Sequence, residues 1–176
     1  VSQAHLEAVK NYPIFPVIAQ QSPRELQKMG RTFQDVLLSA AWGVLESGNI
    51  IPFGADADHL KDEEYLQEGI ESGFSMYTLD GSGVASFQIL SKSEKELQQI
   101  FDSMSPEERE IFNRYADRAF TLRRGLEIDF RRETFFPLFK VYFPVVSFVE
   151  KMNFILQEKL SSYDLEVSLD EGEGVT

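Results

Sequence analysis

Apolar positions spaced three and four residues apart predict a long helix near the start of the chain. Ser22-Pro23-Arg24-Glu25 combines an N-cap serine, a proline at the first helical position and a glutamate three residues after the cap. This combination is a capping box, and it predicts a helix over residues 23–47 that stops at Gly48. The stripe on one face of that helix consists of Leu26, Met29, Phe33, Val36, Leu37, Ala40, Ala41 and Val44.

Two β-prone runs on either side of Asp80-Gly81-Ser82-Gly83 predict an antiparallel hairpin over residues 74–90. A hairpin alone is marginal in water, so its apolar face must pack on helices or gain a third strand. Residues 163–169 alternate apolar and polar positions, which is the pattern of a strand. That strand either completes an antiparallel sheet with the hairpin or docks on the sheet edge of another subunit or partner.

Two further capping boxes lie in the second half of the chain, at Ser93-Glu94-Lys95-Glu96 and Ser105-Pro106-Glu107-Glu108. The second box is expected to open an amphipathic helix of about 25 residues, because apolar positions recur at helical spacing as far as Phe130. The Phe-rich segment 135–149 follows, with Lys140 as its one charge. Pro137 and Pro144 predict that this segment is one bent helix or two helices.

Together these elements predict an α+β fold that is mainly α, with four to five helices around a small antiparallel sheet. A chain of 176 residues with 43% apolar residues suits one domain with a real core. We expect a single helical domain over residues 1–162, with the hairpin at 74–90, followed by a terminal strand and acidic tail over 163–176.

The charge balance disfavours two classes of partner. The chain carries 17 Lys and Arg against 29 Asp and Glu, a formal net charge of −12, which repels nucleic acid and anionic lipid surfaces. No apolar run reaches the about 20 residues of a transmembrane span. The opening residues 1–11 lack the pattern of a signal peptide, so a cytoplasmic location is expected, with a cleaved upstream signal as the alternative.

The sequence contains few of the residues and motifs that usually mark a catalytic site. The chain has no cysteine and two histidines, His5 and His59, which we interpret as surface residues. The acidic stretch from Asp56 to Glu64 lacks the glycine and spacing of a calcium loop and is interpreted as a solvated face. We therefore predict no catalytic residue, no metal site and no cofactor, with a carboxylate-based enzyme as the third choice.

The leading functional hypothesis depends on the Phe-rich segment and on a cluster of seven arginines between Arg109 and Arg132. The segment is either buried at the centre of the fold or meets a partner, and arginines bind carboxylates and phosphates. The hypothesis is a non-enzymatic scaffold that self-associates or docks a protein partner; the alternative is a carrier of a small apolar or anionic ligand in a helical pocket. The predicted partner-binding residues are Phe135, Phe139, Phe143, Phe148, Arg123, Arg124, Leu165 and Val167.

Overall fold

The computed structural model describes residues 2–48 and 51–169, which divide into two compact units. Val84–Phe148 forms the second unit, and the other described residues form the first. One long helix, α7 (Arg132–Lys159), contributes its first part to the second unit and its last part to the first. Within the described residues, no helix is both long enough and apolar enough to cross a membrane.

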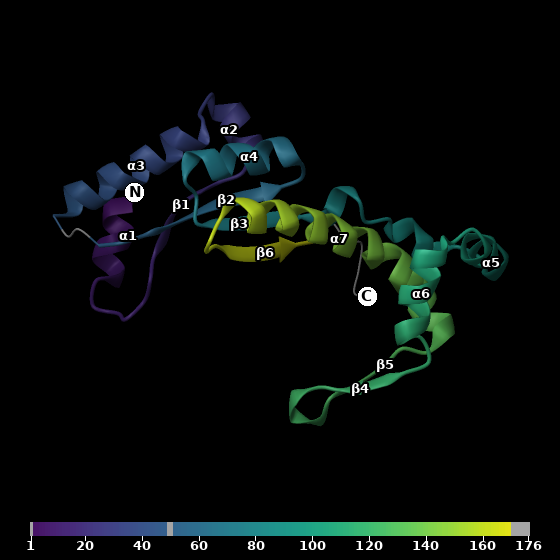
Figure 1. Cartoon of the computed structure of the whole chain (residues 1–176). Coiled ribbons are helices and arrows are strands. Elements are labelled where there is room, and N and C mark those ends of the chain that lie inside the picture. Colours follow the sequence, from purple (N-terminus) through teal and green to yellow (C-terminus); the bar gives the residue numbers. More distant parts are fainter. Residues whose placement is uncertain (1, 49–50, 170–176) are drawn as a thin grey trace. The chain divides into compact units, whose positions relative to one another are not determined.

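The first unit is built on a four-stranded sheet in which every neighbouring pair of strands is parallel (Figure 1). Parallel neighbours need a crossover connection, and helices supply it between β1, β2 and β3. The strand order is β1 (Val17–Gln21), β2 (Gly54–Leu60), β3 (Met76–Asp80) and β6 (Asp164–Ser168). The helices of this unit, besides the end of α7, are α1 (Ser2–Val9), α2 (Pro23–Met29), α3 (Phe33–Ser47) and α4 (Glu63–Ser72).

Helices cover one face of this sheet and build its core. Ala57, Tyr77 and Leu79 on the strands are fully buried, as are Phe33 of α3 and Leu66 of α4. The fit is close where α4 crosses β2, since a Cβ placed on Gly69 would lie 3.1 Å from the Cβ of Ala57. Small residues on strand and helix therefore let the two backbones approach closely at this point.

The opposite face of the sheet carries polar side chains. Successive side chains of a strand point to opposite faces, so the residues between Ala55, Ala57, Tyr77 and Leu79 point away from the helices. Gln20 pairs in register with Asp56, and Thr78 with Glu166. Parallel sheets are usually apolar on both faces, which makes this polar face the unusual feature of the unit.

The second unit packs aromatic side chains around Phe112. It comprises α5 (Glu94–Asp102), α6 (Pro106–Tyr115), the first part of α7, a short hairpin of β4 (Ala119–Thr121) and β5 (Glu127–Asp129), and the 3-10 turns η2 (Phe87–Ser91) and η3 (Arg123–Gly125). The Phe112 ring is fully buried, 5.3 Å from that of Phe135 and 5.4 Å from that of Phe139 between centroids. Edge-to-face and stacked ring pairs of this kind stabilise a small core.

The predicted fold class is wrong, because the first unit is an α/β structure with a parallel sheet. The expected hairpin over residues 74–90 does not form: β3 pairs in parallel with β2 and β6, and the second run becomes the turn Phe87–Ser91. The strand expected near residues 163–169 is confirmed as β6, but its pairing is parallel. The predicted acidic tail falls largely on residues 170–176, outside the described residues.

The helix predictions are confirmed at their starts more often than at their ends. The capping boxes at Ser22, Ser93 and Ser105 form as predicted. The helix over 23–47 is instead two helices, since Gly30 adopts a left-handed conformation and Thr32 caps a new start. The long helix expected after Ser105 ends at Tyr115, and the β4–β5 hairpin takes its place. Both prolines of the Phe-rich segment lie inside the single helix α7.

Candidate active site

The carboxyl ends of β2 and β3 bring together charged side chains. Both strands are parallel, so their ends lie at one edge of the sheet, which is where ligands of α/β proteins usually bind. β2 delivers Asp58, His59 and the following Lys61, and β3 delivers Asp80, followed by Ser82. We therefore take this edge as the candidate active site.

Asp58 and His59 form the first pair at this edge. His59 Nδ1 lies 2.6 Å from an Asp58 carboxylate oxygen, and the two side chains are 38% and 15% exposed. His59 has a φ of 55°, in the left-handed region that non-glycine residues rarely adopt. A carboxylate on one ring nitrogen fixes the orientation of the imidazole. The pair can thus take up or return a proton.

Lys61 and Asp80 form the second pair. The Lys61 ammonium lies 3.2 Å from an Asp80 carboxylate oxygen and donates to the Ser82 hydroxyl at 3.2 Å. The other Asp80 oxygen accepts from the Ser82 backbone N–H at 2.9 Å. Burial alone would raise the pKa of Asp80, but the hydrogen bonds from Ser82 and Lys61 hold that pKa below its ordinary value. Asp80 is therefore an ionised anchor for the ammonium.

Asp56 lies on the polar face of the same strand as Asp58. It is buried, and the Thr78 hydroxyl lies 3.0 and 3.1 Å from its two carboxylate oxygens. Burial raises the pKa of Asp56 to about 6, the Thr78 hydrogen bond lowers it, and the carboxylates of Asp58 and Glu166 raise it. The carboxyl can therefore exist in both protonation states near neutral pH.

Across residues 2–48 and 51–169, no three His, Cys, Asp or Glu side chains gather in a way that could hold a metal ion.

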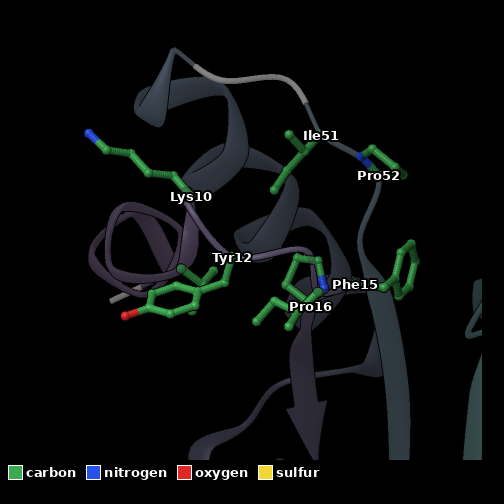
Figure 2. Close-up of a pocket in the computed structure, with 8 residues that line it drawn as sticks. Lys10, Tyr12, Phe15, Pro16, Ile51 and Pro52 are labelled. Carbon is green, nitrogen blue, oxygen red and sulfur yellow. The ribbon is translucent and has the colours of Figure 1, made fainter.

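A pocket of about 370 Å³ lies elsewhere in the first unit, where β1 and β2 begin. Figure 2 shows Lys10, Tyr12, Phe15 and Pro16 on one segment of its wall and Ile51 and Pro52 on another. The pocket lies at the amino ends of the strands and lacks an acid–base pair pointing into it. In barrels and sheets of parallel strands this end serves stability more than catalysis. The carboxyl ends therefore stay the candidate active site.

The structure separates the partner-binding residues predicted from the sequence. Phe135, Phe139 and Phe143 lie together in the core of the second unit, with Phe139 and Phe143 stacked at 4.9 Å. Phe148 is half-buried farther along α7.

The other four predicted residues lie at two separate places. Arg123 and Arg124 form the exposed turn between β4 and β5. Leu165 and Val167 belong to β6 of the first unit, where they are 38% and 48% exposed. As a partner-binding set, the eight residues stay a prediction.

The sequence interpretation missed the charged edge of the sheet. Asp56, Asp58 and His59 were assigned to a solvated acidic face, and Asp80 and Ser82 to a hairpin turn. A usable signal was present, because Gly54-Ala55-Asp56-Ala57-Asp58 alternates small and acidic residues with period two. That alternation is the pattern of a strand with one polar face.

Comparison with known proteins decides the family. Residues 1–176 match the family model of UxaE, tagaturonate epimerase. The chain belongs to the UxaE family. A tagaturonate/fructuronate epimerase from Thermotoga maritima is 38% identical over 174 residues, which cover 98% of this chain and 35% of that protein.

Solved structures of the UxaE family share the fold. A crystal structure of the fructuronate-tagaturonate epimerase UxaE from Cohnella laeviribosi with one glycerol bound matches with a TM-score of 0.91 and 30% identity. The match covers 98% of this chain and 36% of that one. The native crystal structure of the same protein matches over the same shares with a TM-score of 0.85. The chain thus spans about a third of the length of the relatives it matches.

The leading functional hypothesis from the sequence is therefore wrong. UxaE is a family of epimerases, which overturns both the non-enzymatic scaffold and the ligand carrier. The physical reason is that the negative argument relied on known motifs, whereas charged side chains that follow β2 and β3 come together here at one edge of the sheet.

Proposed function

We propose that this protein is an epimerase that interconverts tagaturonate and fructuronate, and that the carboxyl ends of β2 and β3 form part of its active site. The observation that carries the proposal is the match of the whole chain to the UxaE family, together with the Asp58–His59 and Lys61–Asp80 pairs at that edge. The activity is that named for the Thermotoga maritima relative.

The chemistry of the edge suits an epimerisation. Epimerisation of a hydroxylated sugar acid moves protons off and onto substrate hydroxyl groups, so the site needs a group that can take up a proton and return it. In our proposal, His59 does this work, with Asp58 holding its ring through the 2.6 Å contact. Asp56 lies on the same face and supplies a second carboxyl that can carry a proton near neutral pH.

The polar face of the sheet supports the same proposal. Gln20, Asp56, Thr78 and Glu166 give it donors and acceptors suited to the hydroxyl groups of a sugar. A site that pairs with such hydroxyls distinguishes sugars from apolar molecules, because an apolar ligand would leave those groups without partners.

The test is an interconversion assay with the natural full-length protein. Incubation with tagaturonate should yield fructuronate, incubation with fructuronate should yield tagaturonate, and both mixtures should converge on one ratio by NMR. The Thermotoga maritima relative serves as the positive control. Failure of this protein to convert either compound, in an assay where the relative converts both, would contradict the proposal.

A second part of this test concerns His59. We expect His59→Gln to lower kcat by about 100-fold or more, the usual scale for losing a general acid–base group. His5→Gln is the matched control, since His5 lies on the exposed side of α1, and it should keep the wild-type rate. A cytoplasmic location and association with a second copy or a protein partner stay predictions from the sequence.

A further inference from the structure

The Lys61 ammonium is held in place by the ends of two strands. Asp80 is 5% exposed and receives both the Ser82 backbone N–H and the ammonium, so the anion itself is fixed. Lys61 adds a hydrogen bond to the Ser82 hydroxyl. The Lys61 side chain is nonetheless 48% exposed.

Two further carboxylates belong to the sheet whose strand ends hold Lys61. Asp58 lies on the polar face of β2, near its carboxyl end, and Glu166 lies on β6 in register with Thr78. An anion that approaches this face is repelled by both carboxylates unless a cation meets it. His59 is engaged at Nδ1 with Asp58, and its proposed role is proton transfer. The cation anchored by the strand ends is Lys61.

We propose that Lys61, held by Asp80 and Ser82, is the subsite that binds the carboxylate of the sugar acid. The inference rests on the proposed function, because that function makes the ligand an anion. The ammonium binds the carboxylate by charge-assisted hydrogen bonds, which are shorter and stronger than those between neutral groups. Binding there orients the sugar chain towards Asp58 and His59, the neighbouring pair at the edge.

The charge of the ligand supplies the test, because tagatose is the neutral sugar that lacks the carboxylate of tagaturonate. Calorimetry on the full-length protein measures the affinity of each compound. In Lys61→Met the affinity for tagaturonate should fall by about 10- to 100-fold, the range for losing a hydrogen bond to a charged group. The affinity for tagatose should fall far less, so the preference for the acid shrinks.

Two variants make the result specific. Lys61→Arg keeps the positive charge and should lose less affinity for tagaturonate than Lys61→Met. Lys151→Met is the matched control, because Lys151 is an exposed lysine of α7 that pairs with Glu63 on the helical side. Its affinity for tagaturonate should equal that of the wild type.

The outcomes separate this inference from the proposed function. Equal losses for tagaturonate and tagatose in Lys61→Met would overturn the carboxylate subsite, even if the wild type interconverts the two acids. Absence of interconversion would overturn the proposed function, whereas selective loss of tagaturonate binding in Lys61→Met would still support the subsite. A wild-type protein that does not bind tagaturonate would overturn both.

Discussion

Asp56 is a buried carboxyl whose protonation depends on a few neighbours. Burial is the main cause that raises its pKa to about 6. The Thr78 hydroxyl opposes this effect by donating to the ionised form, and the carboxylates of Asp58 and Glu166 add to it. Each neighbour can be changed separately, so each contribution has a predicted sign.

Two substitutions should move the pKa of Asp56 in opposite directions. Thr78→Val removes the hydrogen bond that favours the carboxylate, so the pKa should rise above about 6. Glu166→Gln removes a like charge, so the pKa should fall. Titration of ¹³C-labelled aspartate carboxyls by NMR measures both shifts, with Asp56→Asn assigning the signal. Shifts of the same sign in both variants would contradict the described surroundings of Asp56.

The same carboxyl makes stability depend on pH. Its pKa is 3.8 as an ordinary value and about 6 in the folded protein, so the folded state binds the proton more tightly. The contribution of Asp56 to stability is therefore fully present below about pH 4 and is lost as the pH rises through about 6. Relative to wild type, Asp56→Asn should remove this decline, as measured by urea unfolding between pH 4 and pH 7. A wild-type curve that matches the variant across this range would contradict the raised pKa.

At the scale of elements, the contact between α4 and β2 depends on Gly69. A Cβ at this position would lie 3.1 Å from the Cβ of Ala57 and 3.4 Å from the Tyr77 ring, closer than ordinary packing allows. Alanine also gains about 1 kcal/mol of helix propensity over glycine, which opposes the clash. Overpacking of a tight core costs about 1–3 kcal/mol, so the cost of the clash should equal or exceed the gain in helix propensity.

We expect Gly69→Ala to lower the free energy of unfolding by about 1 kcal/mol as the net of these effects. Gly83→Ala is the matched control, since a Cβ there meets nothing within 4 Å and its φ is not in the left-handed region. Denaturant unfolding of both variants provides the measurement. A gain of stability in Gly69→Ala would mean that α4 can move away from β2 without cost.

The sequence predicts helix starts better than strands in this chain. The capping boxes at Ser22, Ser93 and Ser105 depend on residues within one turn, so local reasoning finds them. The parallel sheet depends on pairing between residues far apart, and its polar face removes the apolar run expected of a parallel strand. β2 was therefore interpreted as a loop, and the candidate active-site residues on it were missed.

Unlike β2, β3 was recognised as a strand but given the wrong partner. Asp80-Gly81-Ser82-Gly83 has the composition of a hairpin turn, and a consistent antiparallel register could be written across it. In the structure, Asp80 and Ser82 instead bind the Lys61 ammonium, and Gly81–Gly83 forms a 3-10 turn. Residues that hold a charged side chain in place can thus have the same composition as a hairpin turn.

At the scale of the molecule, the two units have separate cores. The second unit relies on Phe112, whose ring contacts four other phenylalanine rings. The core of the first unit lies between its sheet and its helices, around side chains such as Leu66 and Tyr77. A substitution that weakens one core should therefore first lower the stability of the unit that contains that core.

Phe112→Ala should destabilise the second unit by about 3–5 kcal/mol, the usual cost of removing a buried phenylalanine ring. Hydrogen exchange followed by mass spectrometry should show lost protection in α5 and α6 before β2 and β3. Phe154→Ala is the matched control, because Phe154 is 59% exposed on α7 and its loss should change exchange little. Equal loss of protection in both units after Phe112→Ala would contradict separate cores.

The location of the active site is tested most directly by a crystal structure of the full-length protein with tagaturonate bound. We predict that the sugar acid lies at the carboxyl ends of β2 and β3, with its carboxylate about 2.8 Å from Lys61 Nζ and its chain beside Asp58 and His59. Tagaturonate bound instead in the pocket of Tyr12 and Phe15 at the amino ends of the strands, or away from Lys61 altogether, would contradict this assignment.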